Sequence, residues 1–111
     1  MQVAELVLDD IDSAMPGVAA GLAVLAGIAA SDAICAIRLG EIHRGENHRD
    51  AGVMLRTAVA DGKKLSDTLM KLLDRKDEAH YGLTVVSSRR ARDSVRWAAI
   101  LVDRATRELS R

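Results

Sequence analysis

The sequence predicts an all-α fold, arranged as a single-domain bundle of about five helices over residues 1–111. Apolar residues recur at spacings of three and four along most of the chain, and no segment alternates as a strand would. Turn-forming residues interrupt this pattern at intervals. A chain of 111 residues is long enough for one core and too short for two domains of ordinary size.

The central element is a long Ala-rich segment from Pro16 to Gly40, in which Asp32 is the only charge before Arg38. Pro16 suits the opening of a helix and Gly40 suits its C-terminal cap. Asp32 shares a stripe with the larger apolar residues, so we expect its carboxylate to be paired or to have a shifted pKa. The predicted inner stripe is Val18, Leu22, Leu25, Ile28, Cys35 and Leu39.

Four further helices are predicted around this segment. One covers residues 2–11, one begins at Asn47, one follows a turn at Asp61 and Gly62, and the last is capped by Ser87 or Ser88. The expected inner faces of the last three are Ala51, Met54, Leu55 and Val59, then Leu65, Leu69, Leu72 and Leu73, then Ala91, Val95, Ala98, Val102, Ala105 and Leu109.

The composition predicts a homodimer. The chain has no Phe, one Trp and one Tyr, so its core depends on aliphatic residues and on many alanines. Small residues let helices approach closely and gain dispersion contacts, but they bury less apolar area per residue. Pairing with a second copy would bury more.

Charge is distributed unevenly although the net charge is zero. The net charge is −5 over residues 1–43, +1 over 44–88 and +4 over 89–111, so the C-terminal part can present a basic surface to phosphate. The single cysteine, Cys35, excludes an internal disulfide and suits a reducing cytosol, where we expect an inert core thiol.

A membrane span is the alternative to a buried central helix, because roughly 20 apolar residues suffice to cross a bilayer. Alanine and glycine dominate this segment, no aromatic residues flank it, and Asp32 would cost about 2.5 to 3.5 kcal/mol on insertion. The first residues also lack the basic region of a signal peptide. We therefore expect no membrane contact and a cytoplasmic location.

No metal or cofactor is expected. The histidines His43, His48 and His80 do not have the spacing of a zinc helix, and a lone cysteine cannot form a thiolate site. The glycines of the central segment lie within a helical pattern and form no phosphate-binding loop. His48, beside Asn47 at a helix start, suits a cap or surface residue better than a ligand.

Arg75 and His80 form the pattern of an arginine followed after four residues by a histidine. Arg38 and His43 repeat it, but only Arg75 and His80 lie between the leucine-rich helix and the last helix. With LAVLAGIAASDAICAIRLG, GENHRDA and KLLDRKDEAHYG, the chain from about Leu22 to Ala105 resembles the HEPN superfamily, in a bacterial, often actinobacterial, subgroup.

The resemblance implies a metal-independent ribonuclease or toxin-type component that cleaves RNA by attack of the 2′-hydroxyl. His80 would act as acid and base, and Arg75 would hold the phosphate. Family members assemble this site across a dimer. Lys76 and Tyr81 depart from the family pattern, in which a polar residue such as Asn follows the arginine and an aromatic lies two after the histidine.

Supporting roles are expected for Asp32, His48 and Tyr81, with Asp32 in contact with His48, Arg75, His80 or Tyr81. Arg89, Arg90, Arg92 and Arg96 open the last helix and suit either an RNA-binding rim or an ordinary solvated face. The alternative to catalysis is an inactive dimeric module that binds RNA, a nucleotide or a protein such as an antitoxin. A structural helical subunit is a third possibility.

Overall fold

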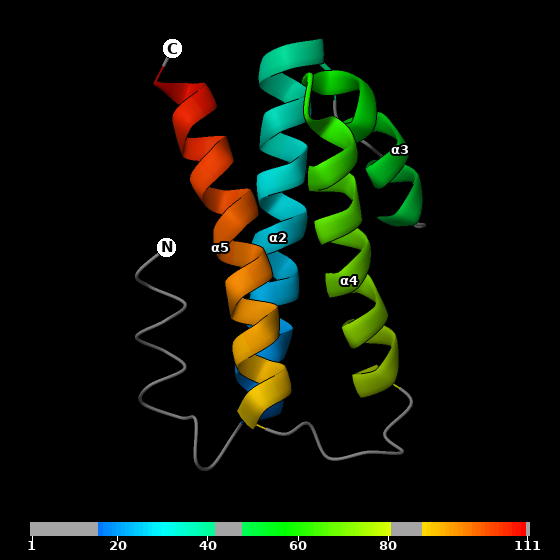
Figure 1. Ribbon diagram of the computed structural model, residues 1–111, viewed down its shortest axis with the longest axis vertical. Helices are drawn as coiled ribbons and strands as arrows, with labels where there is room; N and C mark the ends of the chain where they lie inside the picture. The colour runs from blue at the N-terminus through cyan, green and yellow to red at the C-terminus, as the bar shows by residue number, and fades with distance from the viewer. Residues whose placement is uncertain (1–15, 42–47, 81–87, 111) are drawn as a thin grey trace.

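The computed structural model describes residues 16–41, 48–80 and 88–110, which form four helices and no strand (Figure 1). The all-α class is therefore confirmed, and the predicted helix over residues 2–11 lies outside the described part of the chain. The four helices are α2 (Pro16–Leu39), α3 (His48–Ala58), α4 (Gly62–His80) and α5 (Ser88–Leu109).

The ends of α2 are those that the sequence predicts. The helix begins at Pro16, whose missing N–H costs nothing at a first helical position. At its other end Gly40 has a φ of 73°, and its amide donates to the carbonyl of Ala36 at 3.0 Å. This left-handed conformation suits glycine because a Cβ would be strained there.

The helices form a bundle in which α2 and α5 run side by side in the same direction (Figure 1). Helix α4 runs in the opposite direction, and α3 forms a hairpin with it through the short turn before Gly62. One end of the bundle therefore holds the C-terminal ends of α2 and α5 with the start of α4. The other end holds the last turn of α4 and the first turn of α5.

The four helices share one hydrophobic core. All four leucines predicted for the inner face of α4 are buried, as are Ala91, Val95, Ala98 and Ala105 of α5. Two residues of α5 differ from the prediction: Val102 is half-buried and Leu109 is 70% exposed. Leu109 is the last residue of its helix, and the inner position beside it belongs to Glu108.

The predicted inner stripe of α2 is wrong in register. Val18, Leu22, Leu25 and Leu39 are exposed, Ile28 is half-buried and Cys35 is buried. A Cβ at Gly27 would lie 2.5 Å from Cδ1 of Leu72 and 3.4 Å from Cδ1 of Leu101, so the neighbouring helices approach too closely for large residues. The face that α2 buries is mostly small: Ala19, Ala20, Ala23, Val24, Gly27, Ala30, Ser31 and Ile34.

By length and composition alone, the segment Gly17–Leu39 of α2 could cross a membrane. The core helix of a soluble protein meets the same criterion. Here α2 packs against α3, α4 and α5, which accounts for its apolar character on the inner side.

Candidate nucleic-acid interface

Arg75 and His80 both belong to α4, where His80 is the last helical residue. Their side chains, and the whole of Tyr81, lie outside the described part of the structure. Asp74, immediately before Arg75, accepts a 2.6 Å bond from Nη2 of Arg49. The start of α3 is thereby held beside the part of α4 that precedes Arg75.

His48 is the first residue of α3, next to Arg49. The Arg49–Asp74 bond therefore brings the backbone of His48 near the second half of α4. Nη1 of Arg49 also lies 3.7 Å from Sδ of Met70, one turn before Asp74. His48 and Arg75 thus come from two helices that meet at this level of the bundle.

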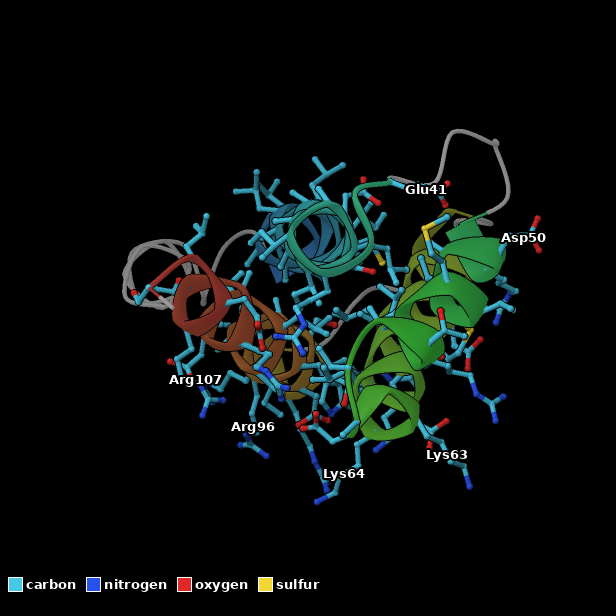
Figure 2. The ribbon with its side chains drawn as sticks, turned by 90° about the horizontal axis from the view of Figure 1, so that it is seen from above. Glu41, Asp50, Lys63, Lys64, Arg96 and Arg107 are labelled. Carbon is cyan, nitrogen blue, oxygen red and sulfur yellow. The ribbon has the colours of Figure 1, made fainter. Side chains whose placement is uncertain are left out.

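The arginines at the start of α5 are all exposed: Arg89, Arg90, Arg92 and Arg96. The side chain of Arg96 is 73% exposed, with Nη1 3.9 Å from Oδ1 of Asp93. Figure 2 shows Arg96 on the same side of the molecule as Arg107, Lys63 and Lys64. The basic charge that the sequence predicts for the C-terminal part is therefore displayed on the surface.

The start of α5 and the end of α4 lie at the same end of the bundle (Figure 1). The fold thus brings the backbone of Arg75 and His80 toward the helix that carries the four arginines. Three of these arginines lie within the first five residues of α5, where the helix macrodipole disfavours positive charge.

Asp32 lies elsewhere in the bundle. Gly27 of α2 lies opposite Leu72 of α4, and the two helices are antiparallel. Asp32 follows Gly27 toward one end of the bundle, whereas His80 follows Leu72 toward the other end. At 1.5 Å per residue, Asp32 and His80 are about 20 Å apart along the bundle axis. Asp32 is half-buried on the outer side of α2, so the structure does not bring it together with the end of α4.

Among the residues that the structure describes, the fully buried carboxylate is that of Glu108, whereas Asp32 is half-buried. The Glu108 side chain is 1% exposed, and its two oxygens accept bonds from different helices. Oε1 lies 2.9 Å from Nε of Arg104, and Oε2 lies 3.3 Å from Nη1 of Arg38. Arg104 also donates from Nη1 to Oδ2 of Asp61 at 2.6 Å. This cluster, Arg38, Asp61, Arg104 and Glu108, joins α2, α5 and the turn before α4.

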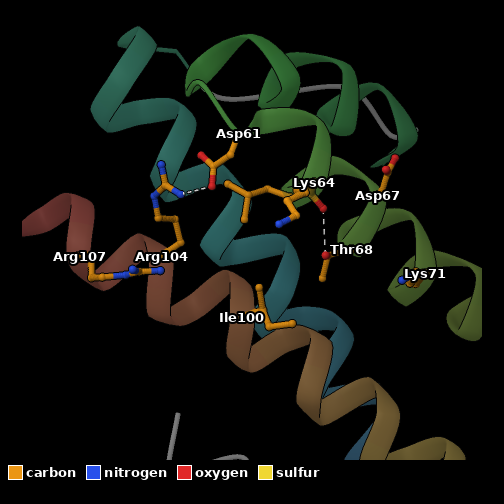
Figure 3. A pocket seen from close by; sticks show the side chains of 9 residues that line it. Asp61, Lys64, Asp67, Thr68, Lys71, Ile100, Arg104 and Arg107 are labelled. Atoms are coloured by element: carbon orange, nitrogen blue, oxygen red, sulfur yellow. Dashed lines mark hydrogen bonds and ion pairs between the residues drawn. The ribbon is translucent and has the colours of Figure 1, made fainter.

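A groove with a volume of about 440 Å³ lies beside this cluster, between the first half of α4 and the second half of α5 (Figure 3). Of the basic groups that line it, Arg104 is bonded to Asp61, and Arg107 lies 3.4 Å from Oδ2 of Asp103. Nζ of Lys71 lies 5.9 Å from the centre of the Trp97 ring. The groove lies toward the end of the bundle opposite Arg89, Arg90 and Arg92.

The pKa values of Asp61, Arg104 and Cys35 are shifted by their surroundings. The hydrogen bond from Arg104 lowers the pKa of the Asp61 carboxyl, and the bonds to Asp61 and Glu108 raise the pKa of Arg104. Burial, with a smaller contribution from the charge of Asp32, raises the pKa of the Cys35 thiol above 9.0. Cys35 is therefore protonated at neutral pH, as expected of a core thiol.

The cluster around Glu108 was not predicted from the sequence. The spacing of Arg104 and Glu108, four residues apart on a predicted helix, was a usable signal for an ion pair. Arg38 and Asp61 gave no comparable signal. Arg38 is 70 positions from Glu108 in the sequence, and Asp61 is 43 positions from Arg104. Within the described ranges, no three His, Cys, Asp or Glu side chains come together as a metal site.

Comparisons with protein-family models, with curated proteins and with solved structures give no match to this chain.

Proposed function

We propose that the chain acts on RNA as a HEPN-like protein, and that it contacts RNA at the end of the bundle where α4 ends and α5 begins. The observation that carries the proposal is the exposure of Arg89, Arg90, Arg92 and Arg96 beside the helix that ends at His80. Exposed arginines that follow one helix suit the phosphates of a single strand. The position of Arg89, Arg90 and Arg92 at a helix start is unfavourable for the helix itself, which favours a role in binding.

Arg75 and His80 are the proposed reacting groups. In metal-independent cleavage, a base removes the proton of the ribose 2′-hydroxyl, whose oxygen then attacks the phosphorus. The P–O bond to the 5′ oxygen breaks, and an acid protonates that oxygen. Histidine can serve as base and acid near neutral pH, and an arginine can stabilise the negative charge of the phosphorane.

The spacing of Arg75 and His80 places them on different sides of α4. Five helical positions separate Arg75 and His80, which places them about 140° apart around α4. One copy of α4 cannot easily direct both side chains at one phosphate. The nuclease form of the proposal therefore requires a site that two copies of the chain build together.

A second candidate function is a catalytically inactive interaction module that binds a protein partner, such as an antitoxin. The exposed apolar residues favour it, because Val18, Leu22 and Leu25 of α2 form a surface suited to a second copy of the chain, and Val53 of α3 is a further exposed apolar side chain that a different protein could contact. In either form we place the protein in the cytoplasm, as a homodimer without a cofactor.

Incubation of the full chain with single-stranded RNA in EDTA distinguishes the two functions. The nuclease form predicts cleavage by the wild type and a loss of about 100-fold or more in His80→Ala. His43→Ala is the matched control, because Arg38 and His43 have the same spacing outside the proposed site. It should cleave like the wild type.

Absence of cleavage by the wild type would contradict the nuclease form. Equal cleavage by the wild type and His80→Ala would contradict it too, since the activity would then come from elsewhere. Absence of cleavage by the wild type, together with RNA binding that persists, would leave a catalytically inactive RNA-binding module.

A further inference from the structure

Helix α2 presents a continuous apolar surface to solvent. Val18 and Leu22 are each 45% exposed and Leu25 is 64% exposed, and Ala29 and Ala36 are exposed as well. These positions follow one another at intervals of three, four and seven, so they lie on one side of the helix. We call the row Val18, Leu22, Leu25, Ala29, Ala33 and Ala36 the outer stripe of α2, in which Ala33 is half-buried and also packs against the core.

The outer stripe lies away from the basic side of the molecule. Viewed along the bundle, α2 lies on one side, and Lys63, Lys64, Arg96 and Arg107 extend from the other (Figure 2). RNA binding at the arginines of α5 would therefore leave the outer stripe uncovered. An apolar row of this length on a described helix calls for a partner that is itself apolar.

Residue size along the outer stripe indicates what that partner is. The first half carries Val18, Leu22 and Leu25, and the second half carries only alanines. We propose that the outer stripe packs against the outer stripe of a second copy, antiparallel and with the two-fold axis near Ala29. Leu22 of each copy then lies over Ala36 of the other, and Leu25 lies over Ala33.

This arrangement is self-complementary because large side chains meet small ones along the whole contact. A parallel pair in register would place leucine against leucine at one end and alanine against alanine at the other. The two helices could not then stay at one separation, and the alanine half would lose its dispersion contacts.

The size of the contact is enough for a reversible dimer. A helix of 24 residues is about 36 Å long. Two such helices in contact bury on the order of 1,000 Å² in total, near the lower limit for specific interfaces. We therefore expect a dimer whose population depends on concentration.

The mass of the full chain in solution tests the proposal. The weight-average mass from sedimentation should rise with concentration from 11.9 kDa toward twice that value. Leu25→Glu should keep the mass at 11.9 kDa. Val53→Glu is the matched control, because Val53 of α3 is also 64% exposed but lies away from the outer stripe. It should dimerise like the wild type.

Cysteine cross-linking tests the direction of the two helices, with Cys35→Ala as the background so that each variant has one thiol. Ala29→Cys lies near the proposed axis and should form a disulfide-linked dimer on oxidation. Ala36→Cys should not, because its two copies would be about 21 Å apart along the helices. Both positions are exposed in the single chain, so access to the oxidant does not distinguish them.

The outer-stripe dimer is separate from the shared nuclease site of the proposed function, because an antiparallel pair with its axis near Ala29 places the two copies of His80 about 30 Å apart along the helices. Its readouts do not use RNA. A dimer without RNA cleavage would reject the nuclease form and keep the outer-stripe interface. A mass of 11.9 kDa at every concentration would overturn the interface, as would efficient cross-linking of Ala36→Cys with none for Ala29→Cys. Binding of the monomer to phosphatidylcholine vesicles that Leu25→Glu abolishes would also overturn it, in favour of a lipid surface.

Discussion

Oε1 of Glu108 lies 2.9 Å from Nε of Arg104, one turn earlier on α5, with the Glu108 side chain 1% exposed. A buried carboxylate is stable only when it is paired and hydrogen-bonded, because its desolvation is costly. Arg104 supplies one partner and Arg38 of α2 supplies the other. The end of the bundle that holds the C-terminal ends of α2 and α5 thus depends on charges that come from both helices.

Replacement of Arg104 should destabilise the protein strongly. Removing one partner of a buried pair costs about 3 to 5 kcal/mol, and since Arg38 still faces Glu108 we expect about 2 to 3 kcal/mol for Arg104→Ala. The free energy of unfolding in urea measures this loss.

Arg107→Ala is the control for that experiment. Arg107 lies on the same helix, 3.4 Å from Asp103, and both side chains are 65% exposed. An exposed pair contributes about 1 kcal/mol or less. Equal losses for the two variants would show that the burial of Glu108 has no energetic consequence.

The charged form of Asp61 should stabilise the folded chain near neutral pH, and this contribution should be lost in acid. Its bond from Arg104 lowers its pKa in the folded chain below the usual 3.8. The folded state therefore favours the charged form, and this contribution is complete above the unfolded pKa and is lost as the pH falls through the folded pKa. Because the Asp61 side chain is 47% exposed, we expect a small effect.

Unfolding of the wild type and Asp61→Asn, measured between pH 7 and pH 2, tests this dependence. The two stabilities should differ near neutral pH and converge as the pH falls through the lowered pKa of Asp61 in the folded chain. A constant difference across the whole range would contradict the assigned bond between Arg104 and Asp61.

Gly27→Ala should destabilise the contact between α2 and its neighbours. The added Cβ would lie 2.5 Å from Cδ1 of Leu72, which is fully buried and has little room to move. Overpacking of this kind costs about 1 to 3 kcal/mol.

Gly17→Ala, on the same helix, should not destabilise the protein. A Cβ at Gly17 meets nothing within 4 Å, so alanine should be neutral or should stabilise the protein by up to about 1 kcal/mol. If thermal unfolding shows the same change for both variants, the close approach of α2 to α4 is wrong.

Much of the fold could be predicted from local sequence. Pro16 and Gly40 mark the ends of α2, and the leucine spacing of α4 identifies its buried face. The register of α2 could not be predicted in the same way, because apolar residues occur on every side of that helix. Which side is buried depends on how closely α4 and α5 approach, as the contact between Gly27 and Leu72 shows.

The candidate site was predictable only in part. The positive charge of α5 follows from the sequence, and the structure shows those arginines exposed. The rule that a buried charge needs a partner was sound, and it applies to Glu108, which is fully buried. The expected position of Asp32 on the inner stripe was wrong, because the register of α2 places it half-buried on the outer side.

RNA affinity as a function of salt tests whether the arginines at the start of α5 contact RNA. The full chain should bind a fluorescent single-stranded RNA, with an affinity that falls as salt rises. The double variant Arg92→Ala and Arg96→Ala should bind more weakly, with a slope in log salt reduced by about 1.4, since each phosphate contact contributes about 0.7. Arg56→Ala, an exposed arginine of α3, should leave the slope unchanged. RNA binding that is absent, or that keeps its slope in the double variant, would contradict the claim that the arginines of α5 contact RNA.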